Sequence, residues 1–272
     1  MKLTSSFIEN FHENGFAILD EIISPELAKS IIDSADELAK SISTDDSFDS
    51  KQSPKISKYL NLVENDRQGA SKVFDALVKI PAFQRYCYSE SLQIIAEQLL
   101  KTNLVLASPT QMNLRSDHPQ EGRHLYPWHN DWSYNFSSAN SLVFWIPLQS
   151  VDEVNGALHI IPKSHTINPK IIVHEKFIKK NQSASYFEIF EINQILESLA
   201  EVRCPLRLGQ GVVFHSKLIH KSGVNLSEDT RFAVQSRWFD ARAADAIKNA
   251  YIGGIDEARD PRIYLSDNLE KS

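Results

Sequence analysis

The sequence contains little glycine and little cysteine. Glycine accounts for 9 of 272 residues, about 3%, where roughly 7% is usual. This scarcity excludes collagen-like, linker-rich and low-complexity chains. Two cysteines, Cys87 and Cys204, are too few for a disulfide framework, and neither belongs to a Cys-x-x-Cys pair. We therefore expect two buried thiols and no thiolate zinc site.

Long apolar runs and an excess of basic charge are also missing. No segment approaches the ~18 apolar residues of a membrane span, and the first ten residues lack the apolar core of a signal peptide. With 35 acidic and 29 basic side chains, the formal net charge is −6, which argues against a nucleic-acid-binding face. Apolar residues make up 42%, enough for a folded core. These features predict a cytoplasmic protein that binds neither nucleic acid nor a membrane.

The sequence changes character near residue 103, without a linker. Residues 1–102 have apolar positions at helical spacing, whereas residues 103–240 consist of short β-type runs between turns, typical of a sandwich or barrel. We expect one domain, with the helical part packed on the β core and a tail over 241–272. A partly helical insertion at 166–203 and a polar loop at 42–57 are the expected lids. The predicted strands cover 16–23, 104–108, 111–115, 141–148, 157–161, 206–208, 212–215 and 231–239.

Histidine is concentrated in the β part, where eight of the nine lie between His118 and His220. His129 and Asp131 are two residues apart, so on an extended segment their side chains point to the same side. With an imidazole from His220 they would form the two-histidine, one-carboxylate set that binds non-haem Fe(II) and leaves coordination positions open. A His-x-Asp triplet alone also fits a hydrogen-bonded core histidine, so it needs support from elsewhere in the chain.

Arg231 supplies that support, because it follows His220 by eleven residues across a turn-rich loop. A guanidinium on the next strand can form a bidentate pair with a carboxylate, which suits the distal carboxylate of 2-oxoglutarate. Taken alone, Arg231 is better explained as a surface residue at a strand edge. His215 is predicted to pack within an apolar strand, since no serine and arginine follow it at matching offsets. Of the other histidines, we expect His165 to cap a turn and His118 to lie at the surface.

Three motifs follow one another between residues 111 and 239. They are Trp-His-Asn-Asp at 128–131, Asn-Gly-Ala-Leu-His-Ile-Ile-Pro-Lys-Ser-His at 155–165, and the segment 209–222 followed by Asn225, Ser227 and Arg231. In this order and spacing they resemble the motifs of the phytanoyl-CoA dioxygenase family of Fe(II)/2-oxoglutarate oxygenases. Three positions depart from the family pattern: Asn130 replaces the commoner glutamine, Lys163 a usual glycine, and Lys221 another glycine.

The resemblance implies a fold and a site. The fold is mainly β with flanking helices: a double-stranded β-helix (jelly-roll, cupin-like) core with an α-helical N-terminal part. The implied ligands of Fe(II) are His129, Asp131 and His220, with 2-oxoglutarate and O2 as co-substrates. The implied 2-oxoglutarate site consists of Arg231, Ser222, Trp145, Gln111 and Asn113, the last two on one face of a strand. For the substrate pocket we consider Arg115, Trp132, Tyr134 and His124, each of which also fits a surface or core position.

The expected reaction is hydroxylation of an unactivated C–H bond of a small molecule, with release of succinate and CO2. Asp131 favours hydroxylation over halogenation, because related halogenases leave the carboxylate position empty. Desaturation, epoxidation and cyclisation can use the same ligands. Two other classes stay open: a non-catalytic jelly-roll binding protein, and a cupin-like isomerase or lyase, which would not need Ser222 and Arg231. Fold and ligand set do not identify the substrate.

Overall fold

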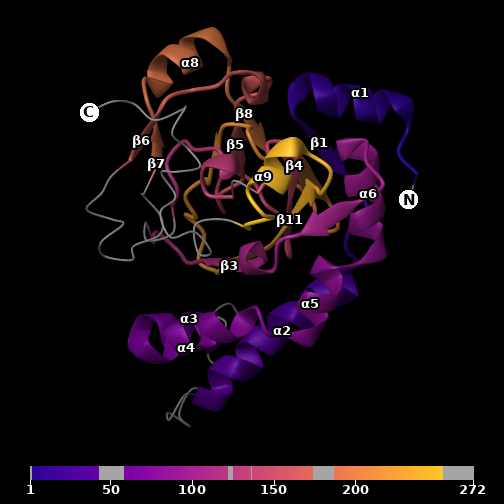
Figure 1. Cartoon of the computed structure of the whole chain (residues 1–272). Coiled ribbons are helices and arrows are strands. Elements are labelled where there is room, and N and C mark those ends of the chain that lie inside the picture. Colours follow the sequence, from indigo (N-terminus) through magenta and orange to yellow (C-terminus); the bar gives the residue numbers. More distant parts are fainter. Residues whose placement is uncertain (1, 43–57, 122–124, 136, 174–186, 254–272) are drawn as a thin grey trace.

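The computed structural model describes residues 2–42, 58–121, 125–135, 137–173 and 187–253 (Figure 1). The N-terminal part is helical: α1 Ser5–Asn14, α2 Pro25–Ile42, α3 Lys58–Asn65, α4 Arg67–Leu77, α5 Pro81–Cys87 and α6 Glu90–Leu100, with strand β1 Phe16–Leu19 after α1. The later strands are β2 Val105–Ala107, β3 Asn113–Asp117, β4 Ser141–Pro147, β5 Leu158–Ile160, β6 Ile171–Val173, β7 Phe187–Ile189, β8 Val202–Cys204, β9 Gly211–His215, β10 His220–Lys221 and β11 Arg231–Asp240. Short 3₁₀ turns η1 Pro109–Gln111, η2 Asp131–Ser133 and η3 Ser164–Thr166 and helices α8 Ile192–Ser198 and α9 Ala244–Lys248 lie between or after them.

The strands form two main antiparallel sheets. The larger sheet has the order β1-β9-β4-β11-β2, and β3 pairs with β11 as well. The smaller sheet has the order β10-β5-β8, and a backbone bridge between His129 and His220 extends its edge. Strands β6 and β7 form a separate pair. Together the two sheets make the jelly-roll core that the sequence predicts.

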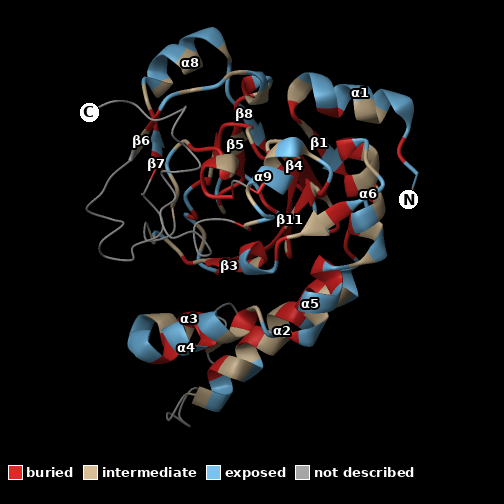
Figure 2. Cartoon of the chain, viewed as in Figure 1, coloured by how far each residue is buried: buried red, intermediate tan, exposed pale blue. Residues whose placement is uncertain are grey.

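Strand β4 is apolar at nearly every position because both of its faces are covered. Leu142, Phe144 and Ile146 join the core cluster that includes the N-terminal helices, whereas Val143 and Trp145 join the cluster between the two sheets. Alternate side chains of a strand point to opposite faces, so a strand covered on both sides reads as one continuous apolar run. Figure 2 shows this burial through the centre of the molecule, with exposed residues on the outer faces of the helices.

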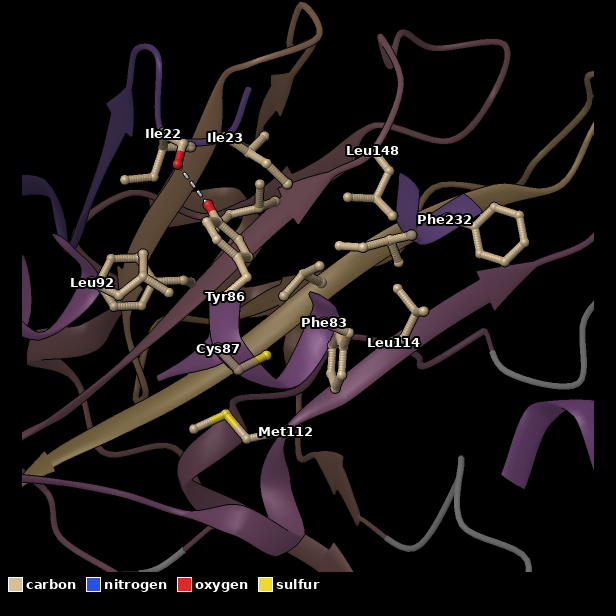
Figure 3. Close-up of a cluster of buried hydrophobic side chains, with 14 of the residues drawn as sticks. Ile22, Ile23, Phe83, Tyr86, Cys87, Leu92, Met112, Leu114, Leu148 and Phe232 are labelled. Atoms are coloured by element: carbon tan, nitrogen blue, oxygen red, sulfur yellow. Dashed lines mark hydrogen bonds between the residues drawn. The ribbon is translucent and has the colours of Figure 1, made fainter. Parts of the chain in front are cut away.

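The helices cover the outer face of the larger sheet. Figure 3 shows Phe83, Tyr86 and Cys87 of α5 packed against side chains of that sheet, including Phe232. The hydroxyl of Tyr86 donates a 2.8 Å hydrogen bond to the carbonyl of Ile22 and so ties α5 to the chain after β1. Burial raises the pKa of the Cys87 thiol to about 12, as it does for Cys204. Both cysteines are free and buried, as predicted.

Several local predictions were wrong. Residues 206–208 do not form a strand; Leu206 makes an isolated bridge to Val151, and the chain then turns at Gly209, whose φ is +95°. The first strand ends at Leu19, because the amides beyond it, at Ile22 and Ile23, bond to the carbonyl of Gly209 rather than continuing the ladder. The polar loop 43–57 and residues 174–186 of the insertion lie outside the described residues. Within the described parts, no helix is both long enough and apolar enough to cross a membrane.

Two histidines also lie where the sequence did not place them. His118 is 7% exposed, and its Nδ1 is 2.9 Å from the hydroxyl of Thr230, so it is buried rather than at the surface. The Nε2 of His165 donates to the carbonyl of His12, 3.1 Å away at the end of α1, instead of capping its own turn. Both contacts join segments more than a hundred residues apart, which local sequence cannot reveal.

Lys163 has a left-handed backbone conformation, with φ 68°, at the position where a glycine is usual. A side chain in this region costs ~1 kcal/mol or more, partly offset by the extra unfolded-state entropy of glycine. We expect Lys163→Gly to be more stable than Lys163→Ala by about 0.5–1 kcal/mol. Both variants lose the exposed ion pair to Glu13 (3.0 Å), so the alanine variant is the matched control. Urea unfolding of the two proteins checks this; equal free energies of unfolding would contradict it.

Candidate metal centre and co-substrate site

Three predicted ligands, His129, Asp131 and His220, converge at one point. Their ligand atoms all lie within 4.8 Å of one another, and they form the potential metal-binding group found among the described residues. The Oδ1 of Asp131 lies 3.4 Å from Nε2 of His129 and 3.6 Å from Nε2 of His220. All three side chains are buried. The spacing argument from the His-x-Asp triplet therefore holds in three dimensions.

The backbone holds these ligands in place. His129 and His220 face each other across an antiparallel bridge, with N–H to O distances of 3.0 and 2.9 Å and ring centroids 4.3 Å apart. Asp131 begins the 3₁₀ turn η2, which the side chain of Asn130 caps by accepting from the amide and hydroxyl of Ser133. The departure at Asn130 thus stabilises the turn that carries the carboxylate.

Both imidazoles present the nitrogen that a metal needs. The Nδ1 of His129 lies 2.8 Å from the carbonyl of Pro127, and the Nδ1 of His220 lies 2.9 Å from that of Leu218. A carbonyl oxygen only accepts, so each Nδ1 carries a proton and Nε2 is the ring nitrogen that faces the cluster. Such bonds from the outer nitrogen commonly orient metal-binding histidines. Burial lowers the pKa of His220 to about 3, so its imidazole is neutral.

Asp131 is ionised by its surroundings. Burial raises the pKa of the carboxyl, but the Arg237 guanidinium and the two imidazoles outweigh this and hold the pKa well below its usual value. The Nε of Arg237 donates to Oδ2 at 2.9 Å, and an Nη lies 2.8 Å from the same oxygen in an ion pair. Oδ1 is the oxygen that faces both imidazoles. Two imidazole nitrogens and one carboxylate oxygen therefore fit a divalent cation of the Fe(II) type.

Arg231 begins β11 on the face that points between the two sheets, and it is 1% exposed. One Nη donates to Oδ2 of Asp117 at 2.8 Å, and the other donates to the carbonyl of Gly156. Its Nε is buried without a hydrogen-bond partner among the described residues. The guanidinium carbon lies 5.6 Å from the centre of the Trp145 ring. A buried, unsatisfied donor on a guanidinium fits an incoming carboxylate, which would complete its hydrogen bonds.

Glycine makes room for this guanidinium. A Cβ at Gly156, whose φ is +89°, would lie 2.6 Å from an Nη of Arg231 and 2.6 Å from the carbonyl of Gly223. A Cβ at Gly223 would lie 2.5 Å from the carbonyl of Ala157. The two segments therefore pass each other at a distance that only glycine allows, and Arg231 lies against this crossing.

The other residues predicted for the co-substrate have mixed positions. Trp145 is buried between the sheets, and Ser222 is buried directly after β10. Gln111 belongs to the turn η1 rather than to a strand with Asn113, so the predicted shared strand face is wrong. Pro109 at the start of that turn supplies the physical reason, because it favours a helical turn at this point. The side-chain nitrogen of Gln111 is nevertheless buried with no partner among the described atoms.

The residues considered for the substrate pocket lie in different places in the structure. Tyr134 lies edge-on to the His129 ring, with centroids 5.8 Å apart. Arg115 lies over the ring of Tyr126, and that ring is 5.0 Å from the His129 ring. Trp132 instead stacks with the ammonium of Lys217, 5.2 Å from its ring centre. His124 lies outside the described residues.

Sequence reasoning missed two charged residues of this region, Arg237 and Asp117. Asp117 accepts hydrogen bonds from both Arg115 and Arg231, at 2.6 and 2.8 Å. Burial raises the pKa of its carboxyl, but the two guanidinium groups lower the pKa by more than burial raises it, so the carboxyl is ionised. Period-two alternation could have found both: Arg237 shares the strand face of Arg231, and Asp117 shares that of Asn113 and Arg115.

A buried cluster of two histidines and a carboxylate inside a double-stranded β-helix defines the class of non-haem Fe(II)/2-oxoglutarate-dependent dioxygenases. A profile of the phytanoyl-CoA dioxygenase (PhyH) family matches residues 11–233, so the chain belongs to that family. The match includes all three clustered ligands and Arg231.

Individual relatives agree with this assignment. A phytanoyl-CoA dioxygenase of Arabidopsis thaliana is 24% identical over 256 residues, covering 85% of this chain and 87% of the relative. The crystal structure of EctD from S. alaskensis with bound Fe has a TM-score of 0.61 at 16% identity, covering 88% of this chain and 77% of EctD. The epimerase SnoN, in complex with Fe3+, alpha ketoglutarate and nogalamycin RO, has a TM-score of 0.55 at 13% identity, covering 94% and 91%.

Family membership establishes the cofactor chemistry. The protein is an Fe(II)/2-oxoglutarate-dependent dioxygenase that uses Fe(II), 2-oxoglutarate and O2. The residues present fit these groups, since three uncommitted donor atoms converge and a buried guanidinium has an unsatisfied N–H.

Proposed function

We propose that this enzyme hydroxylates an unactivated C–H bond of a small-molecule substrate while 2-oxoglutarate is converted to succinate and CO2. The observation that carries this proposal is the Oδ1 of Asp131, which faces the cluster and lies within 3.6 Å of both Nε2 atoms. A carboxylate in this position occupies the place that a halide needs. The bound metal supplies the activation of O2, and the protein supplies ligands, orientation and exclusion of water.

His129, Asp131 and His220 would hold Fe(II), because their free donor atoms face one another in a buried site. Each imidazole is held by its Nδ1 bond to a carbonyl, so the ligands need no rearrangement to bind. Such preorganisation keeps the geometry fixed during the reaction. The burial of all three side chains keeps bulk water from the ligand atoms.

Arg231 would bind the distal carboxylate of 2-oxoglutarate through its unsatisfied Nε and a neighbouring N–H, with Ser222 and Trp145 beside it. Around the site, three guanidinium groups (Arg115, Arg231, Arg237) face two carboxylates (Asp117, Asp131). With a divalent cation added, this excess of positive charge favours a dianionic co-substrate. Gln111, whose buried amide nitrogen has no partner among the described residues, would contact the same molecule.

The test is an anaerobic reconstitution followed by turnover. Purified protein with Fe(II), ascorbate and 2-oxoglutarate should release succinate slowly without a substrate, and omission of Fe(II) should abolish that release. Small molecules that accelerate it are then candidate substrates. With isotopically labelled O2, hydroxylation adds one labelled oxygen to the product, whereas desaturation or cyclisation removes two hydrogens. A protein that binds no Fe(II) would instead support the non-catalytic binding alternative.

A further inference from the structure

Arg237 interacts with one oxygen of the Asp131 carboxylate, Oδ2, and not with the other, Oδ1. The Nε of Arg237 donates to Oδ2 at 2.9 Å, and an Nη lies 2.8 Å from the same oxygen in the ion pair. A bidentate guanidinium–carboxylate pair would bond to both oxygens, but here both nitrogens lie against a single one. Oδ1 instead lies between the two Nε2 atoms, at 3.4 and 3.6 Å.

Arg237 is itself fixed by its neighbours on β11 and η1. Its other Nη donates to the carbonyl of Gln111 at 2.7 Å, and the first Nη donates to Oε1 of Gln235 at 3.3 Å. Its side chain is 11% exposed, and that of Asp131 is 4% exposed. The guanidinium therefore has little freedom to follow the carboxylate if the carboxylate rotates.

We infer that Arg237 is a positioning residue that restricts Asp131 to binding metal through Oδ1 alone. This inference rests on the proposed role of Asp131 as a ligand. Two imidazoles and one carboxylate oxygen occupy one face of an octahedron and leave the opposite face open. If Oδ2 also bound, it would take one of those open positions, which the chelating co-substrate and O2 both need.

The experiment compares Co(II) binding by the wild type, Arg237→Gln and Arg237→Lys. Glutamine and lysine can each donate to Oδ2, but neither provides two fixed donors to one atom. Loss of a group that orients a ligand commonly costs ~10–100-fold in metal affinity, and we expect a loss of this size for Arg237→Gln. We expect a smaller loss for Arg237→Lys, which keeps the charge. We also expect the Co(II) absorption spectrum of Arg237→Gln to change in intensity and shape, because the coordination number changes.

Arg242→Gln is the control, since Arg242 lies just after the same strand and its side chain is exposed. It should bind Co(II) like the wild type. Wild-type affinity and spectrum in Arg237→Gln would overturn the inference, and so would weaker binding with an unchanged spectrum. If Arg237→Gln does not fold, Arg237→Lys decides: wild-type affinity and spectrum would overturn the inference. A wild-type protein that binds no Co(II) would contradict the proposed function instead.

Discussion

Replacing His220 with alanine is expected to lower metal affinity by at least about a hundredfold, since a bound metal gains roughly 2–3 kcal/mol or more from each protein ligand. The loss follows from geometry, because the Nε2 of His220 is one of only three donors that converge among the described residues. Succinate release by the variant should fall to the background level that is measured when no Fe(II) is added. Isothermal titration with Co(II) and the succinate assay measure the two effects separately.

His215→Ala is the matched control for this experiment. His215 is the last residue of strand β9, and burial lowers its pKa to about 3, but it is not part of the ligand cluster. Its Nδ1 accepts from the amide of Lys217 within its own turn. We expect wild-type metal affinity from His215→Ala. Equal Co(II) affinity in His220→Ala and the wild type would contradict the assignment of His220 as a ligand.

Arg231→Gln is expected to raise the KM for 2-oxoglutarate by about thirtyfold or more, because truncating one partner of a buried charge pair costs ~2–5 kcal/mol. The variant should still fold, since Asp117 keeps its ion pair with Arg115. The variant should also keep its affinity for Co(II), because the structure describes no contact between Arg231 and the three candidate ligand residues. Succinate release at varied 2-oxoglutarate concentrations gives the KM.

Arg115→Gln provides the comparison for this prediction. It removes the other guanidinium from Asp117 but leaves Arg231 paired with that carboxylate. The KM for 2-oxoglutarate should therefore change much less than in Arg231→Gln. An unchanged KM in Arg231→Gln, or equal changes in both variants, would rule out Arg231 as the residue that binds the distal carboxylate.

Short-range rules in the sequence predicted the candidate ligand residues and the β-type runs, and the resemblance of the three motifs to the family implied the jelly-roll fold. His129 and Asp131 are two residues apart, and the motif after His220 has a fixed spacing to Arg231. The alternation of β-type runs and turns predicted the strands β4, β9 and β11 within a few residues. The pattern overestimated the length of the first strand. The amides after this strand bond to the carbonyl of the distant Gly209, so the strand ladder ends early.

The partners of charged residues could not be predicted in this way. Arg237 and Asp131 are 106 residues apart, and Arg231 and Asp117 are 114 apart. In the sequence, an arginine within a strand is more often a surface residue. These guanidinium groups are buried because they lie on the inner face of β11, which the fold covers. A buried charged group needs a partner, and so each of them has one.

By itself, the sequence determined the class of this protein. The order and spacing of the three motifs, which carry the candidate ligand residues, are properties of the chain alone. The tertiary structure decided which atom of each ligand is available: carbonyls bind the Nδ1 atoms, and Arg237 binds Oδ2 of Asp131. Hydrogen bonds between distant segments form only when the two sheets close on each other, so the chemistry of the site depends on the fold as well as on its residues.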